Sequence, residues 1–173
     1  MADQPVGSSR VRPMAHTDLE RVLAWRNHPD VRQYMYTQNE ISLDEHLHWF
    51  ERSLQDARKH LLIFEFNDQP LGFVNFSELD GGGIADWGFY AVPDAPKGIG
   101  RRLGQAALHH AFNKLKLHKI CGQALAYNER SRRFHQNLGF QQEGILREQH
   151  YDGERYQNVI CFGLLSCEWQ STP

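Results

Sequence analysis

A strand, a glycine-containing loop and a helix start follow one another between residues 87 and 117. The apolar run 87–92 is typical of a strand and ends at Pro93. A helical pattern then continues to about residue 117, and it begins with Lys97, Gly98, Ile99, Gly100, Arg101 and Arg102. Glycines let the backbone approach an anion, and the N–H groups of a first helical turn lack intrahelical partners. This succession therefore predicts a cradle for phosphate groups.

A tight turn that simply starts a helix is the alternative interpretation of this loop. After Gly100 the next glycine is Gly104, so the dinucleotide-binding pattern G-x-G-x-x-G is absent. No G-K-[ST] follows either, which excludes the nucleoside-triphosphate loop. The choice between turn and cradle therefore depends on the second half of the chain.

The composition is that of one globular domain. We expect a flexible tail over residues 1–9 and a single domain over 10–173. The net charge of −2 gives no general attraction to nucleic acid or to an anionic membrane. No signal peptide and no membrane-spanning run is visible, and the three cysteines do not suggest a disulfide framework. We therefore expect a cytoplasmic protein, and the ten histidines show no zinc-ligand spacing, so no metal is expected.

Hydrophobic periodicity and turn residues predict a mixed α/β chain. Strands are expected at 10–14, 61–66, 71–76, 84–92, 120–127, 144–151 and 156–164. The first helix should end by His28, since Pro29 disfavours helical geometry before it. The second, from residue 43, should bury Leu43, Leu47, Phe50 and Leu54, which leaves His46 and Trp49 to face a cleft. Because a helix connects the fourth and fifth strands, these two should run parallel.

The corner at residues 25–35 is dense in aromatic and hydrogen-bonding groups. One interpretation is an ordinary helix–loop corner. The other is a wall of a substrate site, in which rings cover a flat ligand while Arg26, Asn27 or His28 makes polar contacts.

A second motif supports the phosphate cradle. Residues 95–100 resemble the Q/R-x-x-G-x-G/A pyrophosphate loop of the GNAT superfamily of acetyl-CoA-dependent N-acetyltransferases, with Ala95 in place of Gln or Arg. About 30 residues later, the family signature N-x-x-[SA]-x-x-[LF]-Y-x-x-x-G-F is matched at Asn128, Ser131, Phe134, Gly139 and Phe140. His135 occupies the position of the usual Tyr.

The resemblance implies the GNAT fold, which is α/β (α+β). It has a central mixed, mostly antiparallel twisted sheet of about seven strands, a splay between strands 4 and 5, and about four flanking helices. Acetyl-CoA is the implied co-substrate. Its pyrophosphate would meet the backbone of residues 97–102, its pantetheine would pair with Ala91 and Val92, and Asn128 and Ser131 would contact its arm.

The expected chemistry is direct attack of an amine on the thioester, because the sequence offers no Cys-His-Asp arrangement. A strand bulge would free a backbone N–H near Tyr90 to stabilise the oxyanion. The candidate bases are Asp86, Glu78 and His46, with the two carboxylates preferred. In place of the family's Tyr, His135 would protonate the thiolate, unless a tyrosine such as Tyr90 or Tyr127 serves.

Residues 23–100 resemble the branch of the family that acetylates the 4-amino group of a UDP-linked amino-dideoxy sugar in pseudaminic acid biosynthesis, for flagellin glycosylation. The partners implied are acetyl-CoA and this nucleotide-linked amino sugar. The expected acceptor residues are Arg26, Asn27, His28, Met35, Tyr36, His46, Trp49 and Trp87. The alternatives are a ribosomal-protein alanine N-acetyltransferase and a non-catalytic acyl-CoA-binding module. The C-terminal hairpin could also pair two chains into a homodimer.

Overall fold

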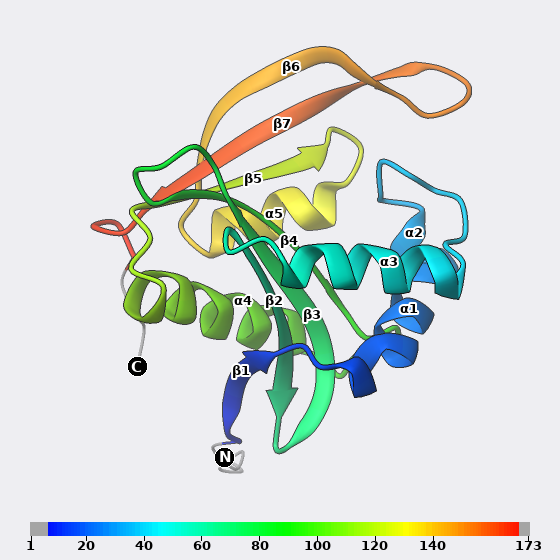
Figure 1. The fold of residues 1–173 in the computed structure, drawn as a ribbon. Helices are drawn as coiled ribbons and strands as arrows, with labels where there is room; N and C mark the ends of the chain where they lie inside the picture. Colours follow the sequence, from blue (N-terminus) through cyan, green and yellow to red (C-terminus); the bar gives the residue numbers. More distant parts are fainter. Residues whose placement is uncertain (1–6, 170–173) are drawn as a thin grey trace, which may run out of the picture.

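The computed structural model describes residues 7–169 and contains one seven-stranded sheet with the order β1-β2-β3-β4-β5-β7-β6 (Figure 1). The strands are β1 (Ser9–Pro13), β2 (Lys59–Phe66), β3 (Gln69–Glu78), β4 (Ile84–Ala91), β5 (Lys119–Leu125), β6 (Gln141–Tyr151) and β7 (Tyr156–Leu165). All neighbouring pairs are antiparallel except β4 and β5, which run parallel as expected from their helical crossover.

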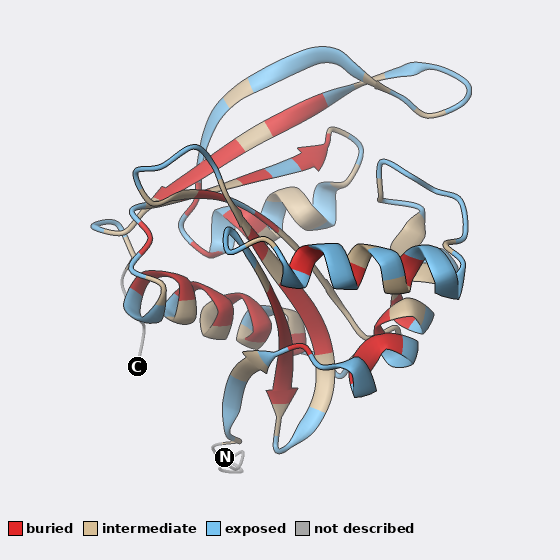
Figure 2. Ribbon diagram, viewed as in Figure 1, coloured by how far each residue is buried: buried red, intermediate tan, exposed pale blue. Residues whose placement is uncertain are grey.

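Five α-helices lie on the two faces of the sheet: α1 (Leu19–Asn27), α2 (Pro29–Arg32), α3 (Leu43–Leu54), α4 (Ile99–His109) and α5 (Glu129–Asn137). Apolar side chains of α1 and α3 pack with Ile63 and Phe73 on one face, which we call the α3 face. Those of α4 pack with Val74, Phe76 and Trp87 on the other, the α4 face. Central strands are accordingly buried and β6 is largely exposed (Figure 2).

Local sequence signals place most elements correctly. The turn between β2 and β3 has positive φ at Asn67 and Asp68, and Gly153 has φ of 101° in the β6–β7 turn. Asn128 caps α5 by accepting a hydrogen bond from the Ser131 N–H at 3.1 Å. Gly139 ends that helix with φ of 94°, where a side chain would be strained.

Two expectations about element details are wrong. Ser9 already belongs to β1, and the Ser8 N–H donates to Asn67 Oδ1, so β1 begins inside the expected tail; residues 1–6 lie outside the described residues. In α3, Leu43 and Leu54 are about half exposed, while His46, Phe50 and Ser53 are buried. The buried stripe is thus rotated, because the sheet packs against the side of α3 that carries Phe50.

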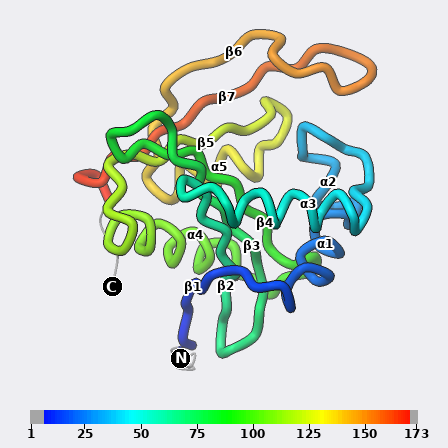
Figure 3. The backbone as a smooth tube through the Cα atoms, in the orientation of Figure 1, coloured from blue at the N-terminus to red at the C-terminus, as the bar shows by residue number. Residues whose placement is uncertain are grey.

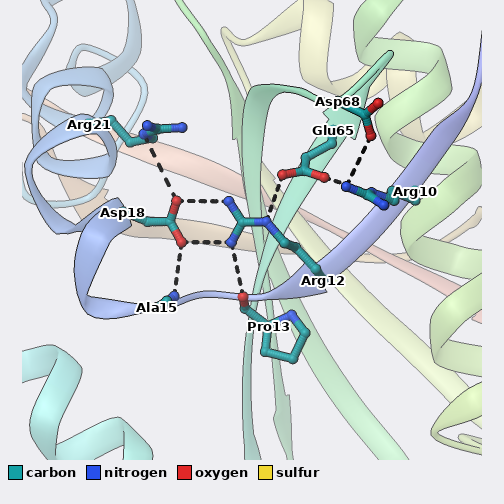
Figure 4. A network of polar contacts seen from close by, with 8 residues as sticks. All are labelled: Arg10, Arg12, Pro13, Ala15, Asp18, Arg21, Glu65 and Asp68. Atoms are coloured by element: carbon teal, nitrogen blue, oxygen red, sulfur yellow. Dashed lines mark hydrogen bonds and ion pairs between the residues drawn. The ribbon is translucent and has the colours of Figure 1, made fainter.

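A buried ion-pair network joins β1, β2 and the start of α1 (Figure 4). The Arg12 guanidinium bridges two carboxylates, donating to Asp18 at 2.7 and 2.9 Å and to Glu65 at 2.6 Å. Asp18 is 1% exposed and Glu65 5%. Arg10 also pairs with Glu65. The network fixes α1, and therefore the corner after it, against the sheet edge.

Strands β4 and β5 are paired only at their beginnings. Ile84 to Asp86 face Lys119 to Cys121, and no strand pairing between them continues beyond that point in the described chain. The sheet therefore opens into the splay expected from the GNAT resemblance. In the part of the chain that the structure describes, no helix is long and apolar enough to cross a membrane.

Candidate active site

The loop before α4 presents unpaired backbone donors, as the sequence predicts. Gly98 has φ of 90° and caps the helix. Among the described residues, the N–H groups of Lys97, Gly98, Gly100 and Arg101 have no hydrogen-bond partner. Arg101 is also exposed. A helix start with several free N–H groups and a neighbouring cation favours an anion.

Two of the expected cradle donors are used internally. The Ile99 N–H donates to the Pro96 carbonyl, and the Arg102 N–H donates to the Gly98 carbonyl, both at 3.1 Å. Ile99 is 3% exposed and packs in the core. The Arg102 guanidinium lies 4.8 Å from the centroid of the Phe66 ring, on the β1 side of α4. The cradle therefore uses fewer backbone donors than the expected range 97–102.

The register of β4 decides which of its backbone groups face the splay. The Val92 N–H donates to the Leu71 carbonyl, and the Leu79 N–H donates to the Ile84 carbonyl. Even-numbered residues of β4 therefore pair with β3, since hydrogen-bonding directions alternate along a strand. The β3–β4 register is continuous, without a bulge. The assignment of the Tyr90 N–H as oxyanion donor is thus wrong, because this group faces β3. The Val92 N–H also faces β3, so the expectation that it pairs with the pantetheine is wrong as well.

Odd-numbered residues of β4 turn their N–H and C=O groups toward β5. Phe89 and Ala91 lie beyond the last paired residues, so their N–H groups face the gap without a strand partner. Ala91 was expected to face the cofactor, whereas Phe89 was not identified from the sequence. The splay therefore offers two backbone donors spaced one strand repeat apart.

His135 lies in the core and cannot serve as the expected general acid. It is 1% exposed. Its Nδ1–H donates to the Ser131 carbonyl at 2.8 Å, and its Nε2 accepts from the Trp87 indole N–H at 3.1 Å. Burial lowers the pKa of His135, against the opposing effect of the Ser131 carbonyl. The ring is therefore neutral, and its one N–H is already donated.

The Trp87–His135 pair closes the base of the splay. Trp87 is 8% exposed and stacks on Phe140 on the α4 face. The expectation that Trp87 contacts the acceptor is therefore wrong. A Cβ at Gly122 would lie 2.5 Å from His135 Nε2 and 2.8 Å from Trp87 Nε1, so only glycine fits there. Trp87 and Gly122, which follow the last paired residues of β4 and β5, are thus tightly packed together with His135.

The two preferred carboxylates lie on opposite faces of the sheet. Asp86 pairs in register with Cys121, is solvent-accessible and lies on the α3 face, and partial desolvation raises its pKa. Glu78 is an even-numbered β3 residue like Val74 and Phe76, so it points to the α4 face. There it bonds His60 at 2.7 Å. Glu78 is therefore wrong as a base, and Asp86 stays a candidate.

The corner after α1 lies over the α3 face. Arg26 donates to the Thr37 carbonyl at 2.6 Å, while its Nη1 is buried without a hydrogen-bond partner. Burial lowers the pKa of Arg26, which the neighbouring Tyr90 partly offsets. Burial strongly raises the pKa of Tyr90. Among the described residues, no carboxylate forms an ion pair with Arg26.

Tyr36 reaches across to the splayed part of β5. Its hydroxyl donates to Gln123 Oε1 at 2.7 Å, and its ring centroid lies 5.2 Å from that of His150 in β6. Figure 3 shows the α2–α3 loop and the β6–β7 hairpin on the same side of the molecule. Cys161 pairs in register with Gln123. Sequence analysis missed this group, although the period-2 alternation from Asp86 and Cys121 could have placed Gln123 on this face.

The remaining expected acceptor residues have mainly structural contacts. Asn27 holds Ile41 through two hydrogen bonds of 2.8 Å, and His28 accepts from the Asp30 N–H as the cap of α2. His46 is buried and stacks on Trp49, with ring centroids 5.1 Å apart. Met35 is half-buried in the α2–α3 loop. No cluster of three or more metal-ligating side chains occurs within residues 7–169.

A splayed sheet with free β4 donors and a helix-start cradle is the arrangement of an acyl-coenzyme A-dependent transferase. Comparison with known proteins agrees with this assignment. The family described as "Acetyltransferase (GNAT) domain" matches residues 10–141 of the chain. The chain belongs to the GNAT acetyltransferase family and is an acetyl-CoA-dependent N-acetyltransferase.

Two curated relatives are named acetyltransferases. The chain is 30% identical over 124 residues to "Acetyltransferase PseH" of Campylobacter jejuni, covering 71% of this chain and 76% of that protein. It is 25% identical to the spermidine N(1)-acetyltransferase of Vibrio cholerae, over 86% and 88% of the two chains.

Solved structures show the same fold. The structure of spermidine N-acetyltransferase from Vibrio cholerae in complex with CoA and spermine has a TM-score of 0.85 at 24% identity, covering 92% of this chain and 96% of that one. An N-acetyltransferase from Staphylococcus aureus has a TM-score of 0.76 at 23% identity, over 92% and 99%.

Proposed function

We propose that this enzyme transfers the acetyl group of acetyl-CoA to the 4-amino group of a UDP-linked amino-dideoxy sugar, in pseudaminic acid biosynthesis for flagellin glycosylation. The resemblance of residues 23–100 and the 30% identity to the PseH relative support this substrate class. The observation that carries the proposal is the charge of Arg26.

Arg26 is half-buried, and a guanidinium that loses part of its hydration without gaining a counter-ion is destabilised, because desolvation is not repaid by a partner. Arg26 has one buried, unbonded nitrogen and no ion pair among the described residues. An acceptor with a diphosphate would supply the missing negative charge and a bidentate partner. A polyamine would place more positive charge beside Arg26, which disfavours spermidine as the substrate.

The proposed chemistry uses the free groups at the splay. The Ala91 backbone pairs with the pantetheine arm, and the Phe89 N–H donates to the carbonyl oxygen as negative charge develops on it. The acceptor amine approaches from the α3 face, loses its proton to Asp86, directly or through water, and attacks the carbonyl carbon. The C–S bond then breaks, and the thiolate, whose conjugate thiol has a pKa of about 8.5, takes a proton from solvent.

The acceptor sugar lies between the corner after α1 and the splayed part of β5. Met35 and Tyr36 cover its apolar face, and Gln123 contributes a polar contact beside the Tyr36 hydroxyl. Trp49 and His46 support this wall from α3 rather than reaching the sugar. Asn27 and His28 hold the corner that carries Arg26.

The test compares Arg26→Met with Arg52→Met, which removes an exposed arginine of α3. Thiol release from acetyl-CoA is followed with the UDP-linked amino sugar as acceptor. We expect Arg26→Met to raise the KM for the sugar at least about tenfold, the size of a lost charge-assisted contact, and to leave the KM for acetyl-CoA unchanged. Equal KM values for the sugar in both variants would contradict the proposal.

A further inference from the structure

A cavity lies between α4 and β1, away from the splay. It has a volume of about 400 Å³ and is lined by β1, α4 and the π-helical turn η2 (His110–Lys114). We call it the β1–α4 groove; the residues used below are Arg10, Arg102, His109, His110, Lys114 and Trp169. Its size is within the range of small-molecule sites.

The α4 wall of the groove carries two cations, Arg102 and Lys114, and two histidines, His109 and His110. Arg102, His109, His110 and Lys114 form no ion pair among the described residues. They lie on one side of the helix, since their spacing follows its turns. The whole chain has a net charge of −2, so this concentration of cations is not a general property of the protein.

The acidic groups near the groove are already paired. Glu65 and Asp68 both bind Arg10, at 2.7 and 3.1 Å, so the β1 wall is close to neutral. Glu78 binds His60. Among residues 7–169, no carboxylate forms an ion pair with a cation of the α4 wall.

The surroundings of His110 favour its neutral form. Burial lowers the pKa of His110, and the charges of His60, Lys114 and His109 lower it further. An anion bound beside His110 would raise this pKa again and favour the protonated ring, which can donate a hydrogen bond to it.

Two independent features of the groove also point to a ligand. The Trp169 indole nitrogen, which lines the groove, is buried without a hydrogen-bond partner among the described residues. The helix wall changes from α to π geometry at His110, where the Leu115 N–H donates to the His110 carbonyl. Single π-turns within helices occur frequently at functional sites.

We propose that the β1–α4 groove binds a small phosphate-bearing anion, separately from acetyl-CoA. The two sites use different parts of α4: its free N–H groups at Gly98, Gly100 and Arg101 form the cradle, whereas Arg102 and the following turns face the groove. Lys114 and Arg102 hold the phosphate groups, and Trp169 donates its indole N–H. This proposal does not depend on the identity of the acetyl acceptor.

The experiment titrates inorganic pyrophosphate into the full-length protein by calorimetry, with saturating coenzyme A present to occupy the cradle. We expect saturable binding that Arg102→Gln and Lys114→Gln each weaken at least about tenfold. Arg52→Gln is the matched control and should bind pyrophosphate as the wild type does, whereas Arg26→Met shows whether any of the signal arises at the acceptor site. A thermal melt confirms that each variant is folded.

Three results would contradict the proposal. No saturable binding in the presence of coenzyme A would mean that pyrophosphate occupies only the cradle. Loss of binding in Arg26→Met alone would assign the anion to the acceptor site. Binding that all variants share, and that salt abolishes, would indicate an adventitious ion only. A parallel titration with uridine monophosphate shows whether the phosphate belongs to a nucleotide. Tighter binding of uridine monophosphate than of pyrophosphate, together with loss of this difference in Trp169→Leu, would assign the groove to a nucleotide.

Discussion

Replacing Arg12 by Met should destabilise the protein strongly, because it leaves two buried carboxylates without their shared partner. Asp18 would keep only the Ala15 N–H and a distant Arg21, at 3.9 Å, whereas Glu65 would keep Arg10. Removing one member of a buried ion pair costs about 3–5 kcal/mol. The Arg12 side chain is 31% exposed, so water can partly replace it, and we expect about 2–4 kcal/mol.

The pH dependence identifies the cause of this loss. Burial raises the pKa of Asp18, but the hydrogen bonds of Arg12 and Ala15 outweigh burial and hold it below its usual value. Arg12 also lowers the pKa of Glu65, against the effect of burial. These carboxylates stabilise the wild type above their unfolded pKa of about 4, and this stabilisation is lost as the pH falls through the lower folded values. In the variant, Asp18 stays buried without Arg12, which raises its pKa above the wild-type value, so the stability difference between the proteins should be smaller at pH 4 than at pH 7.

Urea denaturation at pH 7 and at pH 4, followed by tryptophan fluorescence, measures both effects. Arg58→Met is the control, since it removes an exposed partner of Asp56 and should change little. A difference below about 1 kcal/mol at pH 7, or one that does not change with pH, would refute the reasoning.

Four further changes test the site and the fold. Asp86→Asn should lower kcat about 10²-fold or more and remove the acidic limb of the pH–rate profile. In the wild type the midpoint of this limb should lie above the usual pKa of a carboxylate, because desolvation raises the pKa of Asp86; an unchanged limb in the variant would exclude Asp86 as the base. Gly122→Ala should cost about 1–3 kcal/mol in a thermal melt by separating Trp87 from His135; an unchanged melting temperature would contradict this packing. Gly98→Ala should raise the KM for acetyl-CoA several-fold, because φ of 90° disfavours alanine; an equal KM would exclude the cradle. Ile145→Lys, on the exposed hairpin, should shift a homodimer to monomer in sedimentation, if the expected pairing through β6 and β7 is correct; a monomeric wild type would exclude that pairing.

Strand positions and the parallel β4–β5 pair could be predicted because turn residues and a crossover helix are local signals. The unpaired donors of β4 could not, since they depend on the register with β3. A shift of one residue exchanges the groups that face β3 for those that face the splay, which is why Phe89, and not Tyr90, offers its N–H.

Side-chain roles were predicted least well where burial decides them. Trp87 and His135 are residue types that active sites use, yet tertiary packing joins them in the core. Glu78 and Asp86 look alike in sequence, and only strand pairing places them on opposite faces. Arg26 was identified from its aromatic surroundings, but its missing counter-ion emerges only from the folded structure.

The most direct test measures thiol release from acetyl-CoA with three acceptors in parallel: the UDP-linked 4-amino sugar, spermidine and a peptide with an N-terminal alanine. We predict turnover with the nucleotide sugar and at most a trace with the other two, because the proposed acceptor site uses Arg26 to bind a phosphate group. Preferential turnover of spermidine or of the peptide would contradict the proposed substrate class, while leaving acetyl transfer from acetyl-CoA intact.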